Sequence, residues 1–386
     1  MPLPAYNFYQ QLYCLSVVSN AVTKLSGTPQ ALQAAMEKAL QSNIPDLPGN
    51  WNVTWGPTVL KTSPDLNVGA DNVWFVAVSD TQKACVVAVA GTATTTTRGS
   101  PGWIIDMDVE NVVDFEAWTD TWTIQSISEP PISSPVQGKA YASAGTCQGV
   151  YNLVTTPSPA AASGQTLPEY LAKSVPDGYQ VIFTGHSMGG ALTPTTALGL
   201  VNAKVCQASN TSILPSAGAS PGNKELEQAI SATFPPGTPP PPSTPYEVMN
   251  TDFYNTLDIV PQAWSLDQSA GRYLLNIENI YASASVLMKI KIDALVDWAV
   301  AKSKKSGIAY EPLTGTSFTG ATIVKVTTMP QLEQEAMNEH GTQYWIVIGI
   351  TDWAFQIFQE LLKQPGVEPL PPPKFFIPGD DKDEET

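Results

Sequence analysis

The segment that most constrains the fold of this chain is residues 185–189, which read Gly-His-Ser-Met-Gly. A short apolar run from Tyr179 to Thr184 precedes it and predicts a strand, and a helical pattern from Met188 to Ala203 follows it. The pattern Gly-x-Ser-x-Gly between a strand and a helix is typical of a nucleophile elbow, a sharp turn in which small residues relieve crowding. Ser187 is therefore a candidate nucleophile at a helix N-terminus, where developing negative charge is favoured.

The small number of histidines narrows the choice of a catalytic base. The chain has 2 histidines, His186 and His340, and imidazole is the usual base for a serine nucleophile at neutral pH. His186 directly precedes Ser187, so we expect its side chain to leave the turn in another direction and to be a structural neighbour. His340 is then the candidate base by elimination. It follows a helical pattern over residues 331–339 and precedes Gly341, which predicts a position on a loop that ends a helix.

A carboxylate is needed to orient the base, in the chain order serine, acid, histidine. Asp258 fits best, because it follows a strand-like segment, Tyr246 to Tyr254, and is expected on a loop at the end of that strand. Asp252 is the alternative, and its place within the predicted strand makes it the less suitable of the two.

An oxyanion hole requires backbone N–H groups that point at the tetrahedral oxygen. Met188, directly after the candidate nucleophile, is expected to supply one of them. The turn Ala90 to Ala93 closes a predicted strand and is expected to supply the second, and within it Thr92 can also contribute its hydroxyl group.

The rest of the chain alternates between predicted helices and strands. Apolar spacing predicts a helix within residues 5–25, and Thr28-Pro29 is typical of the N-cap and first residue of another that runs through Leu40. Further strands are predicted at 73–78, 84–90 and 212–217, and further helices at 138–154, 224–234 and 282–305. This alternation favours the α/β class with a parallel sheet. Pro194 falls inside the helix that follows Ser187 and is expected to kink it or to remove a backbone bond.

We expect a single domain over residues 1–365 and a proline-rich, acidic tail over residues 366–386. The proline-dense segment Pro235 to Pro245 is predicted to be a surface loop, because a strand-like segment follows it directly. The first residues lack a basic segment followed by an apolar one, so no export signal is expected in the chain as given. That fits a cytoplasmic protein and equally a secreted protein whose signal has been removed.

Composition excludes several classes of partner. Hydrophobic residues make up 43% of the chain and charged residues 14%, which allows a sizeable core. The net charge of −16 argues against a nucleic-acid partner, because phosphate binding needs clustered cations. No apolar run reaches the ~18 residues expected of a membrane helix. The 4 cysteines are not close in sequence, so no zinc site is expected. Free thiols and disulfides involving Cys14, Cys85, Cys147 and Cys206 both stay open.

Six sequence blocks occur in order between about residues 70 and 345. They are Val-Val-Ala-Val-Ala-Gly-Thr at 86–92, Trp-Ile-Ile-Asp-Met-Asp at 103–108, Gly-His-Ser-Met-Gly-Gly-Ala-Leu at 185–192, Gly-Ala-Ser-Pro-Gly-Asn at 218–223, Asn-Thr-Leu-Asp-Ile-Val-Pro at 255–261, and His340 with Tyr344. As a set they resemble the class 3 lipase family, the fungal-type triacylglycerol lipases. The resemblance implies an α/β-hydrolase fold, with a mostly parallel central sheet flanked by helices. It also implies a triad of Ser187, Asp258 and His340, with Thr92 and Met188 at the oxyanion hole.

The chain departs from the family pattern near the expected lid. The segment Ala93 to Gly102 is polar, whereas the family usually has a short amphipathic helix there. The long segment 265–325 is a candidate helical cap over the site.

The sequence therefore predicts a serine hydrolase of acylglycerol-type carboxylic esters, a lipase or esterase that works through an acyl-enzyme and needs no metal or cofactor. Its expected partner is an ester or lipid substrate. Transient contact with lipid interfaces and the oligomeric state stay open. The same residues are compatible with a thioesterase or an acyltransferase. A non-catalytic scaffold that binds partners through its proline-rich segments is the alternative from another class.

Overall fold

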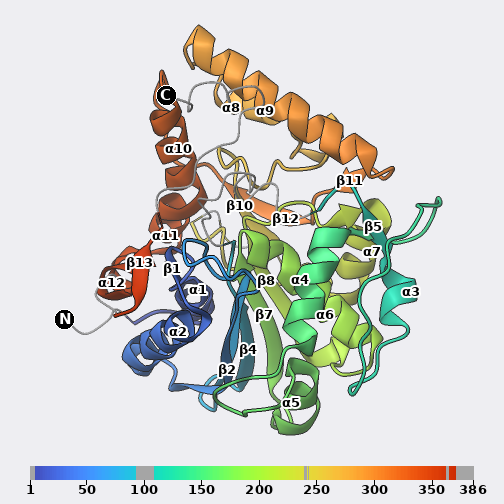
Figure 1. Cartoon of the computed structure of the whole chain (residues 1–386), viewed down its shortest axis with the longest axis vertical. Coiled ribbons are helices and arrows are strands. Elements are labelled where there is room, and N and C mark those ends of the chain that lie inside the picture. Colours follow the sequence, from blue (N-terminus) through green and yellow to red (C-terminus); the bar gives the residue numbers. More distant parts are fainter. Residues whose placement is uncertain (1–4, 93–107, 239–240, 242, 362–364, 371–386) are drawn as a thin grey trace.

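The computed structural model describes residues 5–92, 108–238, 241, 243–361 and 365–370 (Figure 1). Its centre is a seven-stranded sheet in the order β12-β10-β8-β7-β4-β3-β2. The strands are β2 (Trp51–Leu60), β3 (Asn72–Ser79), β4 (Ala84–Val89), β7 (Gln180–His186), β8 (Thr211–Ser216), β10 (Asp252–Asn255) and β12 (Gly315–Phe318). From β4 to β12 the neighbouring strands are parallel, whereas β2, β3 and β4 are antiparallel to one another. The chain thus has the mostly parallel sheet that the alternating pattern predicts.

The inner strands are apolar on both faces because helices cover both faces. On one face, Val86 and Ala88 pack in a core cluster with α1 (Phe8–Ser19), α2 (Pro29–Asn43) and α12 (Thr351–Leu361). On the other face, Val87 and Val89 pack with α4 (Ala144–Thr155), α5 (Leu167–Ser174) and α6 (Met188–Asn202). Figure 1 shows the sheet between these two sets of helices. This layered arrangement is an α/β-hydrolase fold.

Two smaller sheets flank the central one. A four-stranded sheet has the order β11-β9-β6-β5, with β5 (Val112–Asp114), β6 (Tyr141–Ser143), β9 (Gly222–Asn223) and β11 (Tyr310–Glu311). The two-stranded sheet pairs β1 (Leu25–Gly27) with β13 (Val367–Pro369) and so ties the segment between α1 and α2 to the C-terminal part of the described chain. The remaining short elements are α3 (Phe115–Thr119), α7 (Lys224–Thr233) and the 3₁₀ turns η1 (Ile44–Asp46), η2 (Ala208–Asn210) and η3 (Gln268–Ala270).

The segment 265–325 contains α8 (Asn276–Ile280) and the long helix α9 (Val286–Lys305), which lies along the outside of the molecule (Figure 1). Met288, Ile292 and Val296 pack α9 onto a third core cluster. The same segment also supplies β12 to the central sheet. A cap role for it stays a prediction, as does the division at residue 365.

The C-terminal region continues through α10 (Met329–Met337), a π-helical turn η4 (Asn338–Thr342) and α11 (Gln343–Ile348) into α12. His340 lies in the π-helical turn, so the predicted helix-ending loop is wrong. The residues after Gly341 keep helical geometry, and the helix ends only at Gly349. Its φ of 78° is the left-handed conformation that commonly ends helices. Such turns inside helices are frequent at functional sites.

Two other predicted elements need correction. The predicted helix at 138–154 begins only at Ala144, because Ser143 caps it by accepting the Thr146 N–H at 3.1 Å, and residues 141–143 pair as β6 instead. The predicted strand at 246–254 is reduced to Asp252–Asn255. Before it, Asn250 has a positive φ of 61°, which a continuous strand does not allow.

The start of α2 and the state of the cysteines can be compared directly with the sequence. Thr28 caps α2 by accepting the Ala31 N–H at 3.1 Å, with Pro29 in the first turn, as predicted. All four cysteines are buried free thiols. No helix among the described residues is long and apolar enough to cross a membrane. The polar segment 93–102, most of the 103–108 block and residues 371–386 of the predicted tail lie outside the described residues.

Candidate active site

Ser187 lies on a sharp turn between β7 and α6, and the turn leaves no room for side chains at its glycines. The serine itself has φ 62° and ψ −124°, a conformation that costs energy for a residue with a side chain. A Cβ atom added to Gly189 would lie 2.4 Å from the Val89 carbonyl oxygen, and one added to Gly185 would lie 2.5 Å from the Gly189 carbonyl oxygen. The pattern Gly-x-Ser-x-Gly is thus required by the close approach of β4 to this turn.

His340 and Asp258 meet although they lie far apart in sequence. His340 Nδ1 lies 2.8 Å from Asp258 Oδ2, and the Asp258 side chain is fully buried. The Tyr344 hydroxyl donates to the same carboxylate oxygen at 2.8 Å, and the Val260 N–H donates to the other oxygen at 2.9 Å. Because both oxygens have donors, the carboxylate is held in one orientation.

His186 supports the backbone of the other histidine. Its Nε2 lies 2.7 Å from the His340 carbonyl oxygen, and its Nδ1 lies 3.0 Å from the Ser216 hydroxyl oxygen. A carbonyl oxygen can only accept, so Nε2 carries the proton and Nδ1 accepts from Ser216. Burial, together with the neighbouring His340, lowers the pKa of His186 to about 3, so the ring is neutral. Its ring packs against those of His340, which is tilted to it, and Tyr344, which meets it edge-on, at centroid distances of 4.7 and 4.9 Å.

The alternative carboxylate, Asp252, is committed elsewhere. It forms a buried ion pair with Arg272 and accepts the Gly218 N–H at 3.1 Å. Burial raises the pKa of Asp252, although Arg272 opposes this shift. Of the two candidates, Asp258 is the one that contacts the His340 imidazole.

The turn after β4 lies beside Ser187. A Cβ atom at Gly91 would lie 3.1 Å from the Ser187 Cβ, and the Gly91 N–H donates to Asn20 Oδ1 at 2.8 Å. The Thr92 hydroxyl is buried and has no hydrogen-bond partner among the described residues. Met188 is the first residue of α6, so its N–H has no carbonyl partner within the helix.

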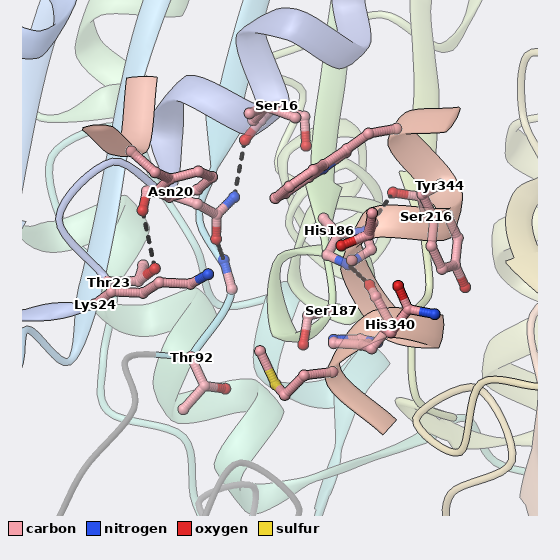
Figure 2. Close-up of a pocket in the computed structure, with 18 of the residues that line it drawn as sticks. Ser16, Asn20, Thr23, Lys24, Thr92, His186, Ser187, Ser216, His340 and Tyr344 are labelled. Carbon is pink, nitrogen blue, oxygen red and sulfur yellow. Dashed lines mark hydrogen bonds between the residues drawn. The ribbon is translucent and has the colours of Figure 1, made fainter. Parts of the chain in front are cut away.

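A cavity of about 820 Å³ joins these groups. Ser187, His340 and Thr92 all line it, and Figure 2 shows the Ser187 hydroxyl and the His340 ring facing the same space. Its described lining comes from α1 and the turn after it on one side and from α10 to α12 on the other. Within the described chain, no residue of 265–325 lines this cavity.

Two contributors to the site were missed at the sequence level. Asn20 comes from the end of α1, where its amide is also fixed by a donated bond to the Ser16 carbonyl oxygen at 2.9 Å. The sequence marks Tyr344 only as part of a block with His340, whereas its direct bond to Asp258 depends on the tertiary fold. No local pattern marks a residue that lies 71 or 86 positions away from its partner.

Among the described residues, no group of three or more His, Cys, Asp or Glu side chains could hold a metal ion. The cavity is lined by the Ser187 hydroxyl and the His340 imidazole, and the buried Asp258 carboxylate lies behind that imidazole. This set suits nucleophilic attack by a serine with proton transfer through histidine.

Residues 119–267, which include Ser187 and Asp258, match the family model "Lipase (class 3)". The crystal structure of M37 lipase superposes with a TM-score of 0.64 at 20% sequence identity, covering 92% of this chain and 99% of that one. No curated protein matches.

Two fungal structures show weaker similarity. The triacylglyceride lipase of Rhizomucor miehei has 18% identity and a TM-score of 0.38, covering 69% of this chain and 78% of that one. The lipase of Rhizopus microsporus var. chinensis has 19% identity and a TM-score of 0.36, covering 70% of this chain and 76% of that one. The comparison of folds therefore rests on M37 lipase, and the family assignment rests on residues 119–267. On these grounds residues 119–267 match the class 3 lipase family, and the chain is a carboxylic ester hydrolase with the fold of M37 lipase.

Proposed function

We propose that this protein hydrolyses acylglycerol-type esters through a triad of Ser187, His340 and Asp258 and an acyl-enzyme intermediate. The observation that carries the proposal is the 2.8 Å contact between His340 and Asp258 behind a cavity that Ser187 and His340 both line. Because a carboxylate accepts, His340 Nδ1 donates to Asp258, and Nε2 is left with its lone pair as the base.

In the first half of the reaction, Ser187 Oγ attacks the ester carbonyl carbon and His340 Nε2 takes the hydroxyl proton. The tetrahedral oxyanion receives hydrogen bonds from the Met188 N–H and from Thr92, whose buried hydroxyl lacks another partner among the described residues. Collapse of this intermediate breaks the bond to the alcohol, and the imidazolium returns its proton to the leaving alkoxide. Ser187 then carries the acyl group.

In the second half, water attacks the acyl-enzyme and gives its proton to His340. The carboxylic acid leaves and the Ser187 hydroxyl is restored. Asp258 keeps the imidazole in the working tautomer throughout, and the Tyr344 and Val260 donors hold that carboxylate in place.

The test is hydrolysis of p-nitrophenyl acyl esters and of an emulsified triacylglycerol by the wild type, Ser187→Ala and His340→Ala. We expect each variant to lose about 10⁴-fold or more in kcat. Ser42→Ala, an exposed serine at the end of α2, is the matched control and is expected to keep full activity. Full activity in Ser187→Ala or His340→Ala contradicts the mechanism. Transfer of the acyl group to an added alcohol in preference to water would favour an acyltransferase.

A further inference from the structure

The cavity carries a cation that the proposed reaction does not use. Lys24 lines it, on the side opposite His340 and Tyr344, together with Asn20 and Thr23 (Figure 2). Among the described lining residues, Lys24 is the only lysine or arginine, and Glu333 on α10 is the only carboxylate. A single cation in the wall of a substrate cavity stands out in a chain of net charge −16.

The backbone of Lys24 is firmly held. Its carbonyl oxygen accepts the Leu370 N–H at 2.8 Å, where β1 pairs with β13. The preceding turn is closed by the Thr23 N–H, which donates to the Asn20 carbonyl oxygen at 3.1 Å. The position of this lysine is thus fixed by both ends of the chain, although its side chain stays exposed.

The side chain of Lys24 has an aromatic neighbour. Its ammonium nitrogen lies 4.7 Å from the centre of the Phe358 ring. The surrounding protein lowers the pKa of Lys24 by partial desolvation even though the residue is exposed at the cavity. An anion in the cavity would favour the charged ammonium and oppose this shift.

An apolar wall connects this cation with the candidate catalytic base. Trp345, five residues after His340, stacks on Phe358 at a centroid distance of 5.7 Å, and Phe355 meets Trp345 edge-on at the same distance. All three rings line the cavity. The wall therefore offers aromatic surface to hydrocarbon, with an ammonium group at its far side.

We propose that Lys24 is a specificity residue that binds the anionic group of an amphiphilic ester, and that such esters are the preferred substrates. This inference rests on the proposed function, because it concerns the same cavity. The shared chemistry is a carboxylate or phosphate on the same molecule as the scissile ester and an apolar chain. Hydrogen bonds to charged groups are among the stronger ones, so the preference has a measurable size.

The experiment compares kcat/KM for matched pairs of esters. In one arm, p-nitrophenyl esters of dicarboxylic acids of increasing length are paired with their methyl-capped neutral forms. In the other arm, a 1-acylglycerol 3-phosphate is paired with the 1-monoacylglycerol of the same chain. The wild type is expected to prefer the anionic member by roughly tenfold in at least one arm, and the arm that shows the preference identifies carboxylate or phosphate.

Four variants test whether Lys24 causes the preference. Lys24→Met keeps the apolar stem but removes the charge, and we expect it to lose the preference for anionic esters. Lys24→Glu is expected to reverse that preference, and Lys24→Arg to retain it. Lys173→Met, an exposed lysine on α5 outside the cavity lining, removes the same charge and is expected to leave the ratio unchanged. Added salt is expected to reduce the wild-type ratio, because the cation is open to solvent.

Hydrolysis of neutral esters with no anionic preference in either arm, or a preference that survives in Lys24→Met, overturns this inference and leaves the proposed function intact. Failure to hydrolyse any of the esters overturns the proposed function itself.

Discussion

At the residue scale, the two histidines differ in their hydrogen-bond partners and therefore in their expected roles. His340 donates to Asp258 and faces the cavity, whereas His186 is neutral and bonds the His340 carbonyl oxygen. Elimination from the sequence identified His340 as the candidate base and His186 as a structural neighbour. It did not predict that His186 supports the backbone of His340, because that contact spans 154 positions.

The lowered pKa of His186 makes stability depend on pH. The pKa is about 3 in the folded chain, against an ordinary value near 6.5 in the unfolded chain. The unfolded chain therefore binds more protons between these values, and the stability from His186 is lost as pH falls from about 6.5 toward 3. We expect the melting temperature to fall less in His186→Gln than in the wild type between about pH 7.5 and pH 5.5. The raised pKa values of the buried Asp252 and Glu339 are common to both proteins and cancel. Equal falls would contradict this role.

Asn20 is expected to position the turn after β4 that carries Gly91 and Thr92. Its side-chain oxygen accepts the Gly91 N–H, one residue before Thr92. Asn20→Ala removes this acceptor, so the turn is held less firmly. We expect kcat to fall roughly tenfold with little change in KM. Asn20→Asp keeps the acceptor and is expected to recover part of the loss. An unchanged kcat in Asn20→Ala would show that the bond is only structural.

At the element scale, the sequence predicted those segments whose ends carry local signals. The Thr28-Pro29 start of α2 and the strand before Ser187 are examples. It failed at residues 141–143 and 246–251, where pairing partners and a positive φ decide the backbone, and at the π-helical turn of His340. In these places tertiary contacts outweigh local propensity.

The turn that holds Ser187 depends on the distance between α6 and β4. We expect Gly189→Ala to destabilise the protein by about 1–3 kcal/mol and to remove most activity, because the added Cβ meets backbone oxygens of Val89 and Ala90. Gly149→Ala, on the helix α4, is the matched control. Its Cβ meets only the end of the Leu192 side chain, which can rotate, so a smaller loss is expected. Chemical denaturation and ester hydrolysis of both variants check this, and equal effects would contradict it.

At the scale of the whole molecule, the cavity is built by the two ends of the described chain. Residues of α1 line one side and residues of α10 to α12 the other, whereas the family match covers only residues 119–267. The candidate triad could be predicted because a short local motif marks Ser187 and the order of serine, acid and histidine along the chain can be read from the sequence. It could not predict the cavity wall, because β1–β13 pairing and the packing of α1 with α12 join positions more than 300 residues apart.

The buried pair of Asp252 and Arg272 ties the segment after β10 to the central sheet. The two side chains are 0% and 4% exposed, and Arg272 also donates to the Leu313 carbonyl oxygen. We expect Arg272→Met to cost about 3–5 kcal/mol in the free energy of unfolding, because it leaves a buried carboxylate without its partner. The double variant Arg272→Met/Asp252→Asn is expected to recover part of this. Urea unfolding of both proteins measures it, and a double variant no more stable than the single one would contradict the interpretation.

The central claim is that Ser187 is a nucleophile activated by His340. The most direct measurement is covalent labelling by a fluorophosphonate, in which the serine oxygen attacks phosphorus and fluoride leaves, followed by intact mass and peptide mapping. We expect one added phosphonyl group, located on Ser187, no labelling of Ser187→Ala and strongly slowed labelling of His340→Ala. An unlabelled wild type, or a label of equal rate in Ser187→Ala, would contradict it.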